Sequence, residues 1–273
     1  MLIAQLTDPH IKPRGQLAYQ RVDTASYLAA TVAHLNAMVP QVDLVLCTGD
    51  LTDLGLPEEY DHFLELVAPL RAPLHVIPGN HDERLAMRRA FPELDARCGD
   101  SAFLHFVLEG QPVRMIGLDT LTDGAAHGTL CPERLEWLDR RLSEAPDRQT
   151  LIFMHHPPFM TGIGHMDAIN CQDGDALAAV LRHHPQVSRI LCGHVHRSIT
   201  LQWHGITASI APAPAHSVAL DLMPDGPSAF MMEPPTCQLH HIHADGSVVS
   251  HVSFIGAFDG PYPFYAADGT LIA

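Results

Sequence analysis

Five short polar clusters in the sequence combine carboxylate, imidazole and amide side chains, which are types that bind metal ions. The clusters are Asp8-Pro9-His10, Gly49-Asp50, Gly79-Asn80-His81, His155-His156 and Gly193-His194-Val195-His196. Imidazole and carboxylate ligands suit Fe, Zn, Mn or Co, whereas softer ions prefer thiolates. Two ions held side by side need a shared ligand, and a carboxylate has two oxygens to offer. Asp50 is the candidate for that bridging position, so the clusters predict a site for two metal ions.

A glycine stands directly before three of the expected ligands, at Gly49, Gly79 and Gly193. Glycine permits sharp turns and lets the backbone pass close to another group. Asn80 is a less common ligand, but its amide carbonyl is a neutral oxygen donor. It would hold an ion without adding negative charge, which leaves that ion electrophilic.

Each polar cluster directly follows a predicted strand, and this order indicates how the clusters meet. Short apolar runs predict strands over 2–7, 42–47, 74–77, 150–154 and 187–191. Apolar residues at helical spacing predict helices over 22–38, 57–70, 132–142 and 173–183, with another ending near residue 88. Ligand sites in open α/β sheets lie at the carboxyl ends of the strands, so we expect the clusters to converge.

The alternation of strands and helices predicts stacked α/β layers. A hairpin is expected over 103–118, and the chain after residue 199 is rich in strands, which favours two packed sheets over one parallel sheet. Two segments rich in Gly, Pro, Met and Ala, 161–172 and 211–236, are expected to be mobile loops or lids. The run His240-His241-x-His243 lies on a strand-like segment, where we expect a surface strand and no metal site.

The composition limits the classes of partner. The 273 residues carry a formal net charge of −15 with 47% hydrophobic residues, which fits one large domain or one domain with an appendage. The negative charge argues against duplex nucleic acid and against an anionic membrane surface. No apolar run reaches the roughly 18 residues of a membrane span, and nothing resembles a secretory signal. The six cysteines are widely spaced and expected to be reduced, so we expect a cytoplasmic protein.

The ordered set of motifs resembles the calcineurin-like metallophosphoesterase superfamily over roughly residues 1–200. The His-His-Pro-Pro loop at 155–158 and the Gly-His-Val-His loop at 193–196 look like those of bacterial class III cyclic nucleotide phosphodiesterases. The segments 14–23, 57–60, 77–82 and 153–158 are similar to a glycerophosphodiesterase branch of that group. The resemblance implies an α/β fold, a four-layer αββα sandwich with two mixed β-sheets flanked by helices.

The resemblance also assigns the site residues. It gives Asp8, His10 and His196 to one metal ion and Asn80, His156 and His194 to the other, with Asp50 bridging. It implies hydrolysis of small phosphodiesters, such as glycerophosphodiesters or cyclic nucleotides, by in-line attack of a metal-bound hydroxide. Three residues are expected to take part in catalysis: His81, Asp50 and Asn80. His81 would stabilise charge or protonate the leaving oxygen, and His155 would orient the ligand beside it.

The substrate and the assembly are expected to involve further parts of the chain. His216 follows the loop 211–215, where glycerophosphodiesterase relatives place an active-site histidine, and Arg14 and Tyr19 are expected to border the substrate entrance with His81. Residues 1–200 would form the catalytic core. Residues 201–273 would complete the second sheet and form a cap or an oligomer interface, so a homo-oligomer is expected.

Two other functions remain open on the sequence alone. A phosphomonoesterase or a nuclease could use the same metal core, although the acidic charge and the lack of a basic groove disfavour a nuclease. A non-catalytic scaffold should have lost ligands, whereas all seven ligand positions are present here.

Overall fold

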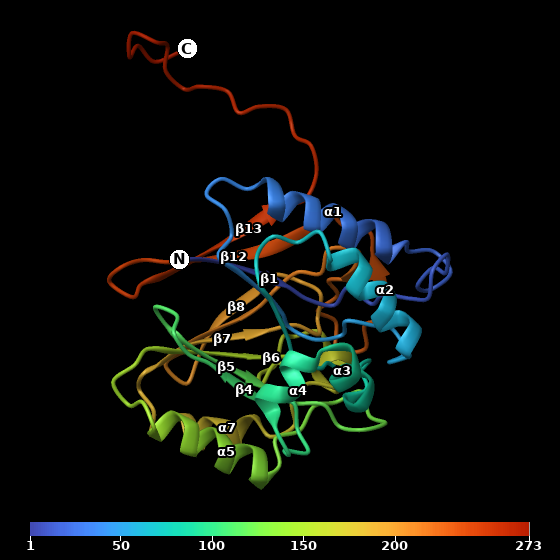
Figure 1. Cartoon of the computed structure of the whole chain (residues 1–273). Coiled ribbons are helices and arrows are strands. Elements are labelled where there is room, and N and C mark those ends of the chain that lie inside the picture. Colours follow the sequence, from blue (N-terminus) through green and yellow to red (C-terminus); the bar gives the residue numbers. More distant parts are fainter. Residues whose placement is uncertain (273) are drawn as a thin grey trace.

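Two β-sheets pack face to face in the computed structural model, which describes residues 1–272 (Figure 1). The strand order is β13-β12-β1-β2-β3 in the first sheet and β4-β5-β6-β7-β9-β8 in the second. Helices cover the outer face of each sheet (Figure 1). The predicted four-layer αββα arrangement with two mixed sheets is confirmed.

The first sheet consists of β1 (Leu2–Leu6), β2 (Leu44–Cys47), β3 (Leu74–Val76), β12 (Thr236–Ile242) and β13 (Val248–Phe254). The three N-terminal strands run parallel, and β12 and β13 are added antiparallel beside β1. Every residue of β2 is buried, as expected for a strand covered on both faces. The strands predicted over 2–7, 42–47 and 74–77 are therefore confirmed to within a residue or two.

The second sheet consists of β4 (Phe106–Leu108), β5 (Arg114–Leu118), β6 (Thr150–Met154), β7 (Val187–Cys192), β8 (Ile199–Trp203) and β9 (Ile206–Ile210). Strands β4 and β5 form the predicted hairpin, and β5, β6, β7 and β9 run parallel. The two sheets share one core, because Leu151, Phe153 and Leu191 of the second sheet pack in the same apolar cluster as Ile3 and Leu46 of the first.

Four helices pack against the apolar cluster that the two sheets share: α1 (Thr24–Ala37), α2 (Pro57–Val67), α3 (Arg84–Ala90) and α4 (Pro92–Cys98). Two helices cover the second sheet, α5 (Pro132–Ser143) and α7 (Gly174–Leu181). The five predicted helices are present, but α4 and the one-turn α6 (Gly164–Asp167) were not predicted. Seven-residue α4 buries only Leu94, so it has no apolar periodicity for a sequence pattern to detect.

The C-terminal segment contributes to both sheets, and not to the second alone as expected. Nearly all of the β8–β9 hairpin and all of β12 and β13 lie within 201–273. Between these pairs, β10 (Ser217–Val218) and β11 (Phe230–Met231) form a separate two-stranded sheet. His241 and His243 are exposed, as expected of a surface strand, but His240 on β12 is fully buried, which corrects the expectation for that residue.

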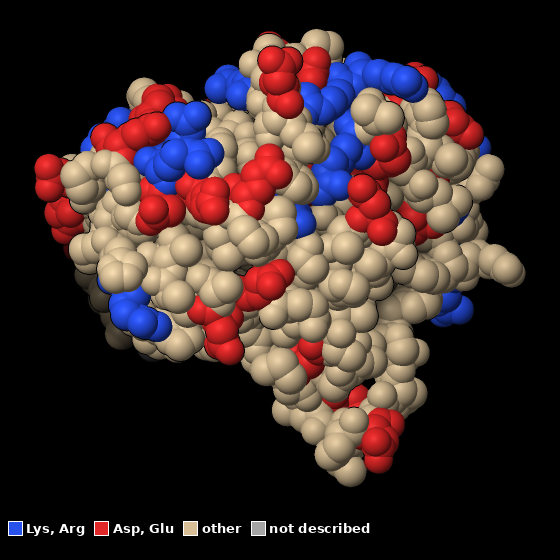
Figure 2. Space-filling model, turned by 90° about the horizontal axis from the view of Figure 1, so that it is seen from below, with Lys and Arg blue, Asp and Glu red and all other residues tan. Residues whose placement is uncertain are grey.

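Most basic side chains on the face shown in Figure 2 lie beside acidic ones. Arg114 and Arg148 both contact Glu109, and Arg141 contacts Glu144. Among the described residues, the structure holds no helix that is both long and apolar enough to cross a membrane.

Candidate metal centre

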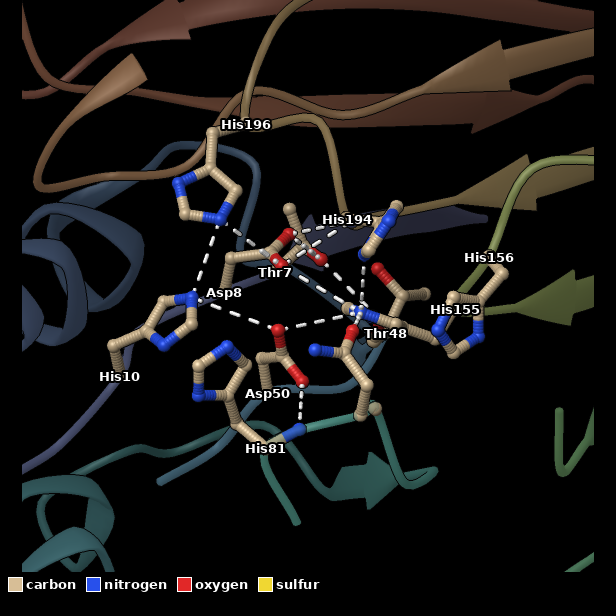
Figure 3. A network of polar contacts seen from close by, with 12 residues as sticks. Thr7, Asp8, His10, Thr48, Asp50, His81, His155, His156, His194 and His196 are labelled. Atoms are coloured by element: carbon tan, nitrogen blue, oxygen red, sulfur yellow. Dashed lines mark hydrogen bonds and ion pairs between the residues drawn. The ribbon is translucent and has the colours of Figure 1, made fainter. Parts of the chain in front are cut away.

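The five polar clusters meet at one edge of the two sheets, where the strands that precede them end (Figure 3). Asp8, Asp50 and Asn80 follow parallel neighbours in the first sheet, and His155 and His194 follow parallel neighbours in the second. Because the carboxyl ends of parallel strands share one edge, the side chains from both sheets are brought into one small volume. The residues of these clusters form overlapping groups suited to hold a metal ion.

Asp8, His10 and His196 form the first group. His10 Nε2 lies 3.2 Å from His196 Nε2, and Asp8 Oδ1 lies 3.3 Å from the same His196 nitrogen. Asp53 lies behind His10, with its Oδ1 3.5 Å from Nδ1, and its other oxygen is 2.6 Å from Lys12 Nζ. A carboxylate behind a ligating histidine fixes the orientation of the ring, a role that the sequence analysis did not assign to Asp53.

Asn80, His155 and His194 form the second group. His155 Nε2 lies 3.2 Å from Asn80 Oδ1 and 3.3 Å from His194 Nδ1. The other ring nitrogen, His155 Nδ1, lies 2.8 Å from the Thr48 carbonyl oxygen and must donate to it. The Nε2 lone pair of a neutral His155 therefore points into the group.

Asp50 lies between the two groups. Its Oδ2 is 3.6 Å from His10 Nε2 and 3.3 Å from His155 Nε2, so one carboxylate oxygen faces both sets of nitrogens. Its Oδ1 accepts a 2.8 Å hydrogen bond from the backbone N–H of His81. This is the arrangement expected of a bridging ligand.

The two adjacent histidines make contacts that differ from those expected of them. The resemblance assigned His156 as the ligand and His155 as its neighbour, but it is His155 that faces Asn80 and Asp50. The ring of His156 is within reach of His194, yet its Nδ1 lies 2.8 Å from Thr120 Oγ1 and its Nε2 lies 3.2 Å from the Ala126 carbonyl. Both nitrogens of His156 are thus engaged with the 119–128 loop. A sequence contains no signal that distinguishes the two neighbours, because only the direction of the strand end decides which ring faces inward.

The backbone is strained at these ligands. Five of them have positive φ angles, which non-glycine residues seldom adopt: Asp8 (53°), His10 (45°), Asp50 (51°), His194 (74°) and His196 (56°). Each such residue costs on the order of 1–3 kcal/mol and persists only when its surroundings impose it. Tyr19, Gln20 and His204 also have positive φ angles, but five of the eight such non-glycine residues are converging ligands, which supports a functional reason for their placement.

Glycine is required where the loops touch. A Cβ at Gly79 would lie 2.1 Å from Asp50 Oδ1 and 2.4 Å from the Asp50 backbone nitrogen, and a Cβ at Gly193 would lie 2.9 Å from Asp8 Oδ2. The glycines identified in the sequence therefore allow one ligand loop to pack directly against the carboxylate of another.

Asp82 ties the Asp50 loop to the Asn80 loop, and the sequence analysis did not single it out. Its buried carboxylate accepts hydrogen bonds from the backbone N–H of Leu51 (3.1 Å) and Gly79 (2.9 Å), and from the Tyr60 hydroxyl (3.0 Å). Burial and the nearby Asp50 carboxylate raise the pKa of Asp82 to about 6. These hydrogen bonds to both loops hold the Asp50 carboxylate and the Asn80 amide at a fixed distance from each other.

The electrostatics of the group favour a bound cation. Burial alone would lower the pKa of His155, but the carboxylates of Asp50 and Asp8 outweigh it and raise the pKa to about 9. Burial would raise the pKa of Asp50, yet the adjacent His155 and His81 hold it well below its usual range. Burial lowers the pKa of His194 to about 3, which leaves its ring neutral, as a metal ligand must be.

The donor set fits two metal ions. Each group presents imidazole nitrogen and carboxylate or amide oxygen to a common point, and the described ligands include no thiolate. A buried nitrogen without a hydrogen-bond partner, His194 Nε2, shows that this ring is not held by a complete hydrogen-bond network of its own. These ligand types accept Fe, Zn, Mn or Co.

The structure places three of the four expected substrate-binding residues at the pocket. A cavity of about 470 Å³ opens onto the metal ligands and is lined by His81, His216 and Tyr19. The ring centroid of His216 lies 4.6 Å from that of His196 and 5.3 Å from that of Tyr19. Arg14 is the exception, because its exposed guanidinium pairs with Glu65 and is not among the residues that line the cavity.

The profile of the calcineurin-like phosphoesterase family matches residues 1–198. The chain belongs to this family. It is 45% identical over its full length, and over the full length of the relative, to a protein of Arcobacter nitrofigilis named "Probable glycerophosphodiester phosphodiesterase GpdQ". It is also 31% identical to the 3',5'-cyclic adenosine monophosphate phosphodiesterase CpdA of Escherichia coli K12, across 92% of this chain and 88% of the relative.

The fold agrees with that of a solved structure. A dimetal phosphatase from Danio rerio superposes with a TM-score of 0.64 at 15% identity, covering 94% of this chain and 99% of the other. The two proteins therefore share a fold.

Separate substitution of the adjacent histidines tests which one is the ligand. We expect His155→Ala to lose one of two bound ions, because it removes a nitrogen that faces both Asn80 and Asp50. We expect His156→Ala to retain both ions. Metal content is measured by elemental analysis after dialysis, and loss of an ion from His156→Ala alone would restore the assignment drawn from the resemblance.

Substitution of Gly79 tests the close contact between loops. Gly79→Ala should displace the Asp50 carboxylate and weaken metal affinity at least tenfold, because a Cβ has no room there. The control is Gly124→Ala, where a Cβ has open space around it and the positive φ of the glycine adds backbone strain without a steric clash. Equal metal affinities in the two variants would contradict the packing argument.

Proposed function

We propose that this protein is a dinuclear metal-dependent hydrolase of small phosphodiesters, acting on glycerophosphodiesters in the first place. The observation that carries the proposal is the Asp50 carboxylate, which lies between two groups of metal-ligating side chains in a chain that belongs to the calcineurin-like phosphoesterase family. The full-length similarity to a relative named for glycerophosphodiester hydrolysis supports the substrate. The relatives named for cyclic nucleotides make a cyclic phosphodiester the second candidate.

The lining of the cavity favours a diester over a monoester. Beyond the metal ligands, the described lining has an apolar and aromatic part made by Tyr19, Met166, Ile169, Val218 and Phe230. None of the described lining residues is Lys or Arg, so the chain offers no cation of its own to a dianionic monoester. A diester carries one charge fewer and has a second alcohol group that can fill the apolar part.

Bound metal ions would neutralise phosphoryl oxygens and acidify water to supply the nucleophile. The chain's own residues orient the reaction. His81 donates from Nδ1 to the Asp53 carbonyl at 2.7 Å, which directs Nε2 toward the cavity and the leaving oxygen. The backbone N–H of His81 holds the Asp50 carboxylate, so one residue positions both the bridging ligand and the group that contacts the substrate.

We propose His155 as the ligand in place of His156, giving the set Asp8, His10, Asp50, Asn80, His155, His194 and His196. His216 and Tyr19 would contact the substrate from the opposite wall. Arg14 has no part in this proposal. Fe, Zn, Mn or Co would serve as the ions, since the donors accept each of them.

We also propose that the protein self-associates in the cytoplasm. Its six cysteines form no disulfide, in keeping with a reducing compartment. Strand β13 is an edge strand with no Asp, Glu, Lys or Arg, and such an edge is a template for pairing with another chain. The segment after it leaves the body of the molecule (Figure 1) and exposes large apolar side chains: Phe258, Tyr262, Phe264, Tyr265, Leu271 and Ile272. A second copy of the chain is the partner that this segment and edge would fit.

A paired assay tests the substrate class. Protein loaded with Mn²⁺ or Co²⁺ should hydrolyse bis(p-nitrophenyl) phosphate at least tenfold faster than p-nitrophenyl phosphate, and glycerophosphodiesters should follow. Asp50→Ala, which removes the shared carboxylate, is the blank and should lose both activities. Faster hydrolysis of the monoester would retain the metal site and overturn the diester assignment, whereas no turnover of either substrate would favour a scaffold.

His81→Ala separates chemistry from metal binding. The side chain of His81 faces the cavity and its backbone holds Asp50, so the variant should keep both ions and lower kcat by about 10²–10⁴-fold. Metal content and steady-state kinetics are measured on the same preparation. Loss of an ion in parallel with kcat would show that the side chain is a ligand.

Removal of residues 257–273 tests self-association. All strands end before this segment, so the shortened chain should fold, bind metal and hydrolyse diesters. The number of chains in each particle in solution should fall. Sedimentation velocity of both proteins at one concentration gives the comparison. An unchanged number of chains in each particle would exclude this segment as the interface.

A further inference from the structure

A fully buried glutamine, Gln5, spans the space between the two sheets next to the metal centre. Its Nε2 lies 3.0 Å from Thr48 Oγ1, at the end of β2, and 2.9 Å from the Cys192 carbonyl oxygen, at the end of β7. Its Oε1 lies 3.0 Å from His240 Nε2 on β12. One amide therefore joins strands of the first sheet to a strand of the second.

Two of the residues that Gln5 contacts, Thr48 and Cys192, lie where the ligand loops begin. Thr48 immediately precedes Gly49-Asp50, and Cys192 immediately precedes Gly193-His194. The Thr48 carbonyl also accepts the hydrogen bond from His155 Nδ1, at 2.8 Å. The Gln5 amide therefore contacts Thr48 and Cys192, the residues that directly precede the loops of Asp50 and His194. Through Thr48 it is also linked to His155.

His240 fixes the orientation of this amide. The Cys192 carbonyl can only accept, so the NH₂ end of Gln5 must face it and the carbonyl end must face His240. His240 must then donate from Nε2 and accept at Nδ1, where Ser250 Oγ lies 2.8 Å away. Burial lowers the pKa of His240 to about 3, which keeps the ring in this neutral form. Every polar atom in the chain of contacts from Ser250 to Cys192 has a partner.

We propose that Gln5 and His240 are positioning residues that set the spacing of the loops carrying Asp50, His155 and His194, and through it the affinity for metal, although neither residue faces the ions. A metal site tolerates errors of only about 0.5 Å in its ligands, and the apolar contacts between the two sheets have no preferred direction. Two directed contacts that join the sheets at this end, from the His194 N–H to the Asp8 carboxylate and from His155 Nδ1 to the Thr48 carbonyl, involve the ligands themselves. The amide adds directed bonds at the level where the loops begin. It also couples the C-terminal strand β12 to a site built from the first 200 residues.

Gln5→Met is the primary test, because methionine keeps the length and burial of the side chain and removes its hydrogen bonds. Calorimetric titration of metal-free protein with Mn²⁺ should show an affinity lowered about 10–100-fold, the usual cost of losing a group that holds a ligand in place. The matched control is Gln238→Met, at the buried residue paired with Gln5 across β1 and β12. Among the described residues, Gln238 makes no hydrogen bond to the ligand loops, so this variant should bind Mn²⁺ as the wild type does.

Thermal unfolding without metal separates positioning from stability. A merely structural role predicts that Gln5→Met lowers Tm of the metal-free protein and leaves the Mn²⁺ affinity unchanged, and this outcome would overturn the proposal. If Gln5→Met fails to fold, His240→Leu provides the test, since it leaves the Gln5 contacts to Thr48 and Cys192 in place but removes the bond that orients the amide. His240→Leu should lower the affinity by a smaller factor than Gln5→Met.

A double variant tests whether the two residues act through one path. His240 reaches the loops only through Gln5, so Gln5→Met/His240→Leu should bind Mn²⁺ no more weakly than Gln5→Met alone. Additive losses would contradict the coupling. This measurement needs no substrate, so its outcome does not depend on the substrate proposal. Wild-type protein that binds no Mn²⁺ would instead refute the metal centre itself.

Discussion

Two buried carboxylates, Asp8 and Asp50, lie at the meeting point of two sheets, and their charge must be compensated for the fold to persist. Isolated ionised carboxylates are costly to bury, and here they are surrounded by the imidazoles of His10, His155 and His196. The protein places five histidine and asparagine donors around them from both sheets. This concentration of negative charge and lone pairs in a small buried volume is what makes the edge a metal site.

The positions of these groups depend on loops held under strain. Positive φ angles at five ligands bend the chain so that side chains turn inward, and glycines at 79 and 193 let the loops touch. Hydrogen bonds between the loops that carry the ligands help to offset the cost of that strain. Asp82 joins the loops within the first sheet, and the Gln5 amide joins the first sheet to the second. The large apolar core supplies most of the stability, while these few polar groups give the site its geometry.

The cavity combines this polar floor with walls contributed by segments far apart in the chain. Tyr19 comes from the loop before α1, Met166 from α6, and His216 and Phe230 from the region of β10 and β11. Tyr19 and Phe230 pack with ring centroids 5.0 Å apart, so the N-terminal loop and the C-terminal segment form one wall. The alcohol groups of a substrate would therefore be selected by parts of the chain outside the matched family region as well as within it.

Much of this protein could be predicted from the sequence, because its chemistry-bearing residues directly follow short buried strands. The alternation of strand and helix predicted the two-sheet sandwich, and the motifs located Asp8, His10, Asp50, Asn80, His194 and His196 near one another. Apolar periodicity is a local property, so the strands and longer helices were identifiable, whereas α4 and α6 were too short to show a period. What only the tertiary structure decided is which way each side chain points across space. It directs His155 inward and His156 toward Thr120, pairs Arg14 with Glu65 away from the cavity, and buries His240 against Gln5. These choices depend on contacts between residues distant in sequence, which local spacing does not encode.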